Sequence, residues 1–265
     1  MRRLAESLCL VRSTILFWAL LVWTLGEEAQ AKIPVSIELV LAVDTSASVD
    51  GFEYGLLMNG MANAFRAEEV IELIGQHNSV AVALIQWSSD VDERFMIPWH
   101  LLTDRASVLA FADRVAAAER DPDRRFTGIG EAIDFSVRAI ADNAFDGHQL
   151  KIDISGDGRN NVGLPLSVSR QRANALGIVI NGLPILTHIV DYSLRKPLRA
   201  SDDYYGLEKY YREEIIHGPG AFIEIANDYD DFARAFLRKL KREIAPAISQ
   251  EKPAPRAVQE AQAGP

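Results

Sequence analysis

The sequence predicts an α/β fold, a doubly wound and mostly parallel sheet of about six strands with helices on both faces. Residues 37–43 and 80–87 are almost wholly apolar, which is typical of central strands that are covered on both sides. Stretches with apolar residues at helical spacing alternate with such strands along the chain. This alternation indicates crossover units, which place successive strands parallel to one another.

Six segments are predicted as strands, at residues 37–43, 80–87, 95–97, 150–155, 179–185 and 221–226. Pro98 should stop the third strand, which we expect to run antiparallel at an edge, where proline is tolerated. The pair Asn181-Gly182 predicts a bulge or a turn within the fifth strand. Residues 186–199 carry no pattern that assigns them to a helix or a strand.

Helices are predicted after Asp50, Asp104 and Thr127 and at residues 165–176, 207–216 and 229–244. Asp50 is a suitable N-cap, because its carboxylate can accept hydrogen bonds from the first backbone amides. Phe52 belongs to the apolar face expected for the helix that follows. In the last helix, Phe232, Phe236 and Leu240 recur every four residues and predict a strongly amphipathic segment.

Residues 1–31 have the pattern of a secretory signal peptide. Three arginines precede an apolar run at residues 15–23, and Ala29-Gln30-Ala31 supplies a cleavage signal of small residues. An uncleaved membrane anchor is the alternative, but residues 15–25 fall short of the roughly 20 residues that a spanning helix needs. Cleavage predicts a periplasmic or secreted protein without a membrane span. Its domain would cover residues 32–245, followed by a disordered tail at residues 246–265.

Composition limits the classes of function. The chain has 265 residues, of which 48% are hydrophobic, enough for one large domain with its own core. Its net charge of −9 at pH 7 argues against nucleic-acid binding and favours cations or basic partner surfaces. The single cysteine, Cys9, lies in the predicted signal peptide. Cysteine-ligated metals and thiol catalysis are therefore not expected in the mature domain.

Oxygen-bearing side chains follow the first predicted strand. Asp44, Ser46 and Ser48 alternate where this strand ends, and open α/β sheets bind ligands at the carboxyl ends of their central strands. Carboxylate and hydroxyl oxygens suit a hard cation such as Mg²⁺. The alternative is ordinary capping and turn chemistry, in which Asp44 caps the next helix and the two serines close the turn.

Three separated motifs resemble those of von Willebrand factor A domains. Asp44-x-Ser46-x-Ser48 is similar to the first motif of their metal-ion-dependent adhesion site (MIDAS). The segment Thr127-Gly-Ile-Gly-Glu-Ala-Ile opens a helix and Ile152-Asp-Ile-Ser-Gly-Asp-Gly closes a strand, in the order that the family has them. With its Ser-Gly-Asp-Gly-x-Asn-Asn loop and the later Gly-Pro-Gly-Ala-Phe, the chain looks like a member of an uncharacterised bacterial family of exported von Willebrand A-like proteins. The resemblance covers residues 34–245.

The resemblance implies a metal site made of Asp44, Ser46, Ser48, Thr127 and Asp157. The two serines would bind the ion directly, the two aspartates directly or through water, and Thr127 directly when a ligand is engaged. Mg²⁺ is the expected ion, with Mn²⁺ and Ca²⁺ as alternatives. A carboxylate of a protein partner would fill the open coordination position of this ion. The resemblance further implies that ligand engagement is coupled to movement of the C-terminal helix.

Two carboxylates at one site need a compensating group. At about 5 Å and an effective dielectric constant near 20, they repel by roughly 3 kcal/mol. A shared proton, a cradle of hydrogen bonds or a divalent cation could offset this repulsion, and the neutral hydroxyls favour the cation.

Gly156 departs from the pattern that is commonest in animal members of the family.

The predicted function is a non-enzymatic binding module without catalytic residues. Ser46 stands where an aspartyl phosphotransferase needs a second acid, and the sequence has no nucleophile elbow, P-loop or dinucleotide-binding motif in a suitable context. A metal-dependent envelope hydrolase and a structural subunit with a vestigial, metal-free site are the alternatives. Arg159, Asn160 and Asn161, beside the proposed ion, could contact a partner or form a turn.

Overall fold

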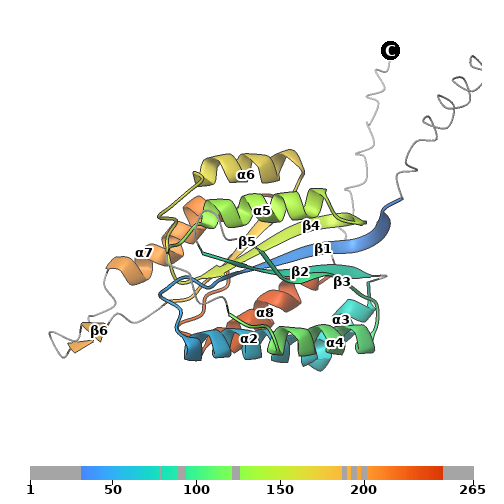
Figure 1. Ribbon diagram of the computed structural model, residues 1–265, viewed down its shortest axis with the longest axis horizontal. Helices are drawn as coiled ribbons and strands as arrows, with labels where there is room; N and C mark the ends of the chain where they lie inside the picture. The colour runs from blue at the N-terminus through green and yellow to red at the C-terminus, as the bar shows by residue number, and fades with distance from the viewer. Residues whose placement is uncertain are drawn as a thin grey trace, which may run out of the picture. The chain divides into compact units, whose positions relative to one another are not determined.

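Five strands form the main sheet, in the order β3-β2-β1-β4-β5 (Figure 1). The computed structural model describes residues 31–77, 79–88, 94–120, 126–186, 190–191, 196–197 and 202–246. The strands are β1 (Ile33–Asp44), β2 (Val80–Trp87), β3 (Arg94–Leu102), β4 (Phe145–Gly156) and β5 (Val179–Pro184). A separate small sheet pairs β6 (Val190–Asp191) with β7 (Lys196–Pro197). The prediction of a mostly parallel sheet is confirmed, since β1 runs parallel to β2 and β4 parallel to β5.

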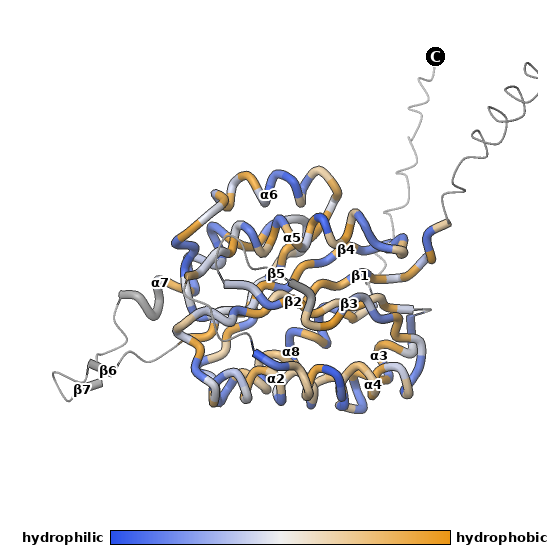
Figure 2. Tube along the Cα trace, in the orientation of Figure 1, coloured by the Kyte–Doolittle hydropathy of each residue, from blue (hydrophilic) through white to orange (hydrophobic). Residues whose placement is uncertain are grey.

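Helices cover both faces of this sheet (Figure 1). One face carries α2 (Gly51–Arg66), α3 (Glu68–Gly75), α4 (Arg105–Ala116) and α8 (Phe232–Ile244). The other carries α5 (Ile129–Ala141) and α6 (Leu166–Ala175), together with α7 (Asp202–Tyr210) and the π-helix η1 (Tyr211–Ile215). Strand β1 is buried on both sides, because Leu39 and Leu41 join the first hydrophobic cluster while Val40 and Ala42 join the second. Figure 2 shows the same arrangement, with hydrophobic central strands between helices of mixed character.

The N-caps that the sequence predicts are confirmed, but one expected core residue is not in the core. Asp50 and Asp104 begin α2 and α4 with capping boxes. Phe52 was expected on the buried face of α2, yet its side chain is 72% exposed. It lies in the first turn of the helix, which begins beyond the end of β1, so the sheet does not cover it.

Strand β3 is an antiparallel edge strand, as predicted, but Pro98 does not stop it. The strand continues to Leu102 and pairs with β2 on both sides of Pro98. The pairing shifts in register between Val82, opposite His100, and Leu84, opposite Ile97. Pro98 lies within this irregularity, where the missing backbone N–H breaks no regular ladder bond.

The predicted sixth strand does not form. Residues 221–226 run beside β5 and make only isolated bridges, at Ile223 and Ala226. The predicted interruption of β5 at Asn181-Gly182 is also wrong, because β5 is continuous from Val179 to Pro184. Gly182 is explained by packing instead, since a Cβ at this position would lie 2.7 Å from the ring of Tyr211.

Helix α8 carries buried charges that the apolar spacing does not reveal. Its apolar face is buried as predicted, but Lys239 and Glu243 are also fully buried. The ammonium of Lys239 lies 2.7 Å from Asp153 Oδ2 of β4 and 2.8 Å from Glu243 Oε1. The side-chain amide of Asn181 on β5 donates to both oxygens of Glu243 at 2.9 Å. These contacts join α8 to the two strands beneath it.

Several predictions fall on other parts of the chain. The signal peptide, apart from Ala31, and the tail beyond Pro246 lie outside the described residues. Within the described part, no helix has the length and apolar character that a membrane crossing requires.

Candidate metal centre

Asp44 stands at the end of β1 with one of its carboxylate oxygens unpaired. The parallel register places Asp44 opposite Trp87 of β2, and only 1% of its surface is exposed. Its Oδ1 accepts a hydrogen bond of 2.8 Å from the backbone N–H of Ser46. Its Oδ2 is buried and has no hydrogen-bond partner among the described residues. An unpaired buried carboxylate oxygen is costly, so this atom indicates a missing partner.

A chain of hydrogen bonds leads from the serines to Asp157, the residue after β4. The hydroxyls of Ser46 and Ser48 lie 3.0 Å apart, and Ser48 donates to Asp157 Oδ1 at 2.9 Å. The phenol of Tyr229 donates to Asp157 Oδ2 at 3.0 Å. Four of the five residues predicted for the site are thus brought together by direct contacts at the carboxyl ends of β1 and β4, and both oxygens of Asp157 are satisfied.

The two carboxylates affect one another. Burial, and then the negative charge of Asp157, raise the pKa of Asp44 to about 8, against the opposing effect of hydrogen bonding from Ser46 and from the backbone of Asp157. Burial also raises the pKa of Asp157, while the hydroxyls of Ser48 and Tyr229 oppose the rise. Without a cation, Asp44 therefore holds a proton over much of the neutral range. A proton and a cation compete for the same carboxylate.

Thr127, the fifth predicted residue, lies beside the loop that follows β4. A Cβ built on Gly158 would be 3.3 Å from Thr127 Oγ1, so the hydroxyl is adjacent to the residue after Asp157. The loop is braced by its asparagines. Asn161 Oδ1 accepts from the N–H of Thr127 at 2.9 Å, and Asn160 Oδ1 accepts from the N–H of Gly130 at 3.0 Å. Of the two roles considered for these asparagines, the contacts agree with loop formation.

Gly156 provides the space that Asp44 occupies. A Cβ at this position would lie 2.9 Å from Asp44 Oδ2 and 3.2 Å from Trp87 Cη2. The first distance is shorter than real Cβ contacts allow. The departure from the commonest family pattern therefore has a structural reason, because only glycine leaves the Asp44 carboxylate in place.

Two residues of the site were not found from the sequence. Tyr229 was predicted as the first residue of the last helix, and its place soon after the last predicted strand was the available signal. Arg120 lies outside the sequence motifs, but its guanidinium donates to the carbonyl oxygens of Thr45 at 3.3 Å and Ser46 at 3.0 Å. It therefore supports the backbone of the first motif.

The side chains present suit a hard divalent cation. They offer two carboxylates and three hydroxyls, all of them oxygen ligands. No group of three or more His, Cys, Asp or Glu side chains placed to hold a metal occurs within the part of the chain that the structure describes. A metal here would therefore depend on the neutral hydroxyls of Ser46, Ser48 and Thr127 as well as the two acids.

The fold is similar to known structures at low sequence identity. A proximal thread matrix protein from the mussel byssus, with a zinc-occupied MIDAS motif, aligns with 80% of this chain and 48% of its own, at 13% identity and a TM-score of 0.53. The pilus adhesin SpaC from Lactobacillus rhamnosus GG aligns with 81% and 31%, at 14% identity and a TM-score of 0.55. A von Willebrand factor type A protein from Catenulispora acidiphila aligns with 79% and 42%, at 14% identity and a TM-score of 0.52. This chain spans less than half the length of each.

Comparison at the level of sequence identifies a family. No curated protein matches the chain significantly. The family model described as "Protein of unknown function (DUF1194)" matches residues 34–248, which is most of the chain. The chain therefore belongs to the DUF1194 family, and its fold is that of von Willebrand factor A domains.

Proposed function

We propose that this protein is a non-enzymatic binding module that holds a divalent cation and uses it to bind a carboxylate of a protein partner. The cation would be held by Asp44, Ser46, Ser48, Thr127 and Asp157. The observation that carries the proposal is the buried, unpaired Oδ2 of Asp44, beside a second carboxylate and a group of hydroxyls.

The charges of these side chains favour Mg²⁺, with Mn²⁺ or Ca²⁺ as substitutes. Two ionised carboxylates carry the charge that one divalent cation neutralises, and the hydroxyls add ligands without adding charge. Mg²⁺ prefers six ligands and retains water molecules, so a partner's carboxylate could replace a water. Because the hydroxyl ligands are neutral, the cation would keep its attraction for that carboxylate.

Exposed aromatic side chains beside the site support a protein partner. Large apolar side chains that are exposed are few among the described residues, and two of them adjoin the predicted ligands. Phe52, 72% exposed, follows the Ser48 turn, and Phe126, 51% exposed, precedes Thr127. Aromatic side chains of this kind are enriched among the residues that dominate binding at protein interfaces.

The proposed place of action is the periplasm or the cell exterior. The signal-peptide pattern of residues 1–31 is the main support for export. The names of two similar structures, a thread matrix protein and a pilus adhesin, are in keeping with it. Fractionation of cells that produce the full chain, with N-terminal sequencing of the product, would test both export and cleavage before Lys32.

Cation binding can be tested by thermal unfolding in EDTA and in MgCl₂. A ligand that binds only the native state stabilises it by about 2.7 kcal/mol when present at 100 times its Kd. We expect Mg²⁺ to raise the melting temperature of the native protein and Asp44→Ala to abolish this increase. Asp113→Ala, which removes an exposed carboxylate of α4, should keep the full increase. An increase that survives in Asp44→Ala would place the ion elsewhere, and no increase in the native protein would favour the vestigial site.

A second experiment separates binding from hydrolysis. Native protein, Asp44→Ala and a Phe52→Ser/Phe126→Ser double variant would be used to capture partners from an envelope extract, in Mg²⁺ and in EDTA. We expect capture that requires both Mg²⁺ and the two phenylalanines, without turnover of generic ester or phosphate substrates. Turnover that requires Mg²⁺ and Asp44 would instead support the envelope hydrolase.

A further inference from the structure

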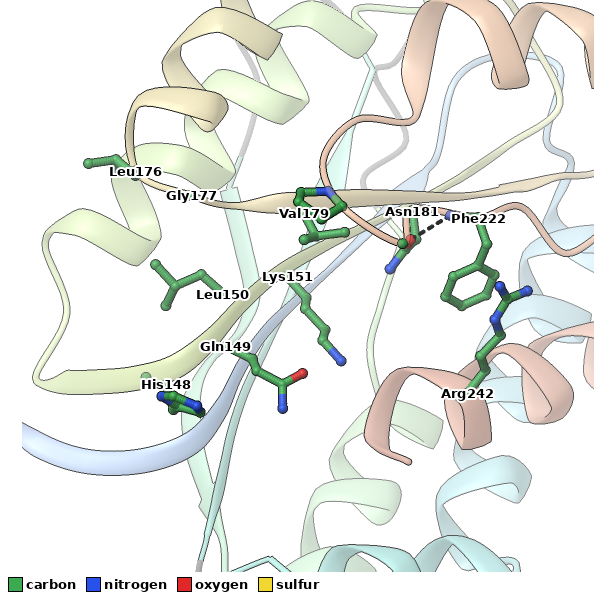
Figure 3. Close-up of a pocket in the computed structure, with 13 residues that line it drawn as sticks. His148, Gln149, Leu150, Lys151, Leu176, Gly177, Val179, Asn181, Phe222 and Arg242 are labelled. Atoms are coloured by element: carbon green, nitrogen blue, oxygen red, sulfur yellow. Dashed lines mark hydrogen bonds between the residues drawn. The ribbon is translucent and has the colours of Figure 1, made fainter. Parts of the chain in front are cut away.

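A cavity lies at the end of the sheet opposite the candidate metal centre, where β4 and β5 begin (Figure 3). It has a volume of about 550 Å³, within the range of small-molecule sites. Its walls come from residues 147–151 of β4, from Val179 and Asn181 of β5, and from Arg242 of α8. Because β4 is extended, Lys151 and Asp157 lie about 20 Å apart along it. The cavity and the candidate metal centre are therefore separate.

The lining is positively charged, although the chain as a whole is negative. Lys151 and Arg242 line the cavity, and the lining includes no aspartate or glutamate. The whole chain carries a net charge of −9. In Figure 3 the side chains of Gln149 and Lys151 extend from β4 toward α8. Burial lowers the pKa of Lys151, against the opposing charge of Glu243, so an anion in the cavity would favour the charged ammonium.

Among the described residues around the cavity, Arg242 is a cation without a counter-charge. The charge of Lys151, which lines the cavity, and that of Lys239 behind it are balanced by Asp153 and Glu243. Arg242 makes no ion pair with the described residues, and its guanidinium carbon lies 3.7 Å from the centre of the Phe222 ring. Stacking on the ring orients the guanidinium plane and leaves its N–H groups available to an anion.

The remaining walls are suited to an apolar group. Leu150, Val179 and Phe222 line the cavity together with Leu176, a large apolar side chain that is 46% exposed. The backbone of Phe222 is fixed by a hydrogen bond of 2.9 Å from its N–H to Asn181 Oδ1. Apolar walls with a few oriented polar groups are the usual composition of a site for a small organic ligand.

We propose that this cavity binds a small organic monocarboxylate. Its carboxylate would pair with Arg242 and approach Lys151, and its apolar portion would lie against Val179 at the start of β5. One uncompensated positive charge matches a carboxylate better than a phosphate dianion. The proposal does not depend on the cation at the other end of the sheet.

The test uses the full chain in EDTA, so that the candidate metal centre plays no part. Binding of octanoate, octanamide and octyl phosphate would be measured by isothermal titration calorimetry. We expect octanoate to bind at least about tenfold more tightly than the uncharged octanamide, and more tightly than octyl phosphate. Arg242→Gln should weaken octanoate binding by about tenfold or more. Lys241→Gln removes the same charge from the neighbouring residue of α8, which does not line the cavity, and should leave the affinity unchanged.

Four results would overturn the proposal. Equal affinity for octanoate and octanamide would show that the charge is not recognised. Unchanged octanoate affinity in Arg242→Gln, or an equal loss in Lys241→Gln, would remove the assigned role of Arg242. Tighter binding of octyl phosphate than of octanoate would show that the anion class is wrong. Melting temperatures of both variants would confirm that each is folded before the affinities are compared.

Discussion

The phenol of Tyr229 donates a 3.0 Å hydrogen bond to Oδ2 of Asp157, and this contact ties the segment before α8 to the loop after β4. Burial, and then the negative charge of Asp157, raise the pKa of Tyr229 well above its usual value, so the phenol remains a donor. The same oxygen could otherwise face a cation. The stability of this contact should therefore depend on whether a cation is bound.

Replacing Tyr229 by phenylalanine should destabilise the protein by about 1.5–3 kcal/mol in EDTA, the usual worth of a hydrogen bond to a charged group. In Mg²⁺ the loss should be smaller, because the cation provides Asp157 with another partner. Urea unfolding under both conditions measures the difference. Tyr54→Phe is the matched control, since Tyr54 donates to the neutral carbonyl of Ala118 at 3.0 Å. An equal loss of stability of Tyr229→Phe in EDTA and in Mg²⁺ would show that the Tyr229–Asp157 contact does not depend on the cation.

The stability of the metal-free protein should fall as the pH rises from 6 to 8. The pKa of Asp44 is about 8 in the folded protein, against 3.8 for an ordinary aspartate, so the folded state binds more protons between these values. Stability from such a group is complete below the unfolded pKa and is lost as the pH rises through the folded pKa. Asp153, whose pKa is about 6, also makes the stability fall as the pH rises, but mainly at lower pH.

Urea unfolding in EDTA across this pH interval, with the native protein and Asp44→Asn, tests the assignment. The variant should show a flatter dependence, because its amide cannot titrate. In the native protein, stabilisation by Mg²⁺ should increase over the same interval, since the cation displaces a proton from Asp44. If Asp44→Asn keeps the full slope, another group is responsible.

Gly156→Ala should disturb the candidate metal centre from outside the set of proposed ligands. Its methyl group would lie 2.9 Å from Asp44 Oδ2, and we expect a loss of about 1–3 kcal/mol, as in other overpacked sites, together with loss of stabilisation by Mg²⁺. Gly55→Ala is the control. A Cβ at Gly55 in α2 meets nothing within 4 Å, so this change should stabilise the helix by about 0.5–1 kcal/mol. Full stabilisation of Gly156→Ala by Mg²⁺ would contradict the proposed place of Asp44.

Lys239→Met should cost about 3–5 kcal/mol, because it leaves Asp153 and Glu243 buried without their shared cation. Lys241→Met, on a partly exposed face of the same helix, should change the stability by less than about 0.5 kcal/mol. Denaturant unfolding of both variants gives the comparison. Similar losses in the two variants would show that the buried ion pairs do not hold α8.

Much of the architecture could be read from the sequence, because apolar runs and caps are local signals. Strand β2 has the bounds that its apolar run predicts, and Asp50 and Asp104 begin their helices. The predictions that were wrong concern residues whose roles depend on contacts with distant parts of the chain. Pro98 is tolerated because its strand is at an edge with irregular pairing. Gly182 looks like a turn residue, but it serves the packing of Tyr211, a contact between distant segments.

The candidate site was predicted through its motifs, and the structure brings Asp44, Ser46, Ser48 and Asp157 into one hydrogen-bonded group. Cation binding itself stays a prediction. Tyr229 and Arg120 were missed because each contacts the site across a long sequence separation, and neither belongs to a motif. Similarly, apolar spacing could not show that Lys239 is buried, since a lysine in an amphipathic helix normally faces solvent.

The buried charges of α8 also bear on how the protein could respond to a ligand. A slide of the helix by one turn is a translation of about 5.4 Å. This movement would separate Lys239 from Asp153 and Glu243 from Asn181. Buried charges without partners are strongly destabilising. The buried ion pairs and hydrogen bonds of Lys239 and Glu243 therefore oppose the helix movement that the family resemblance implies. A conformational change at the carboxyl ends of the strands would therefore move only the short segment around Tyr229, while α8 keeps its position.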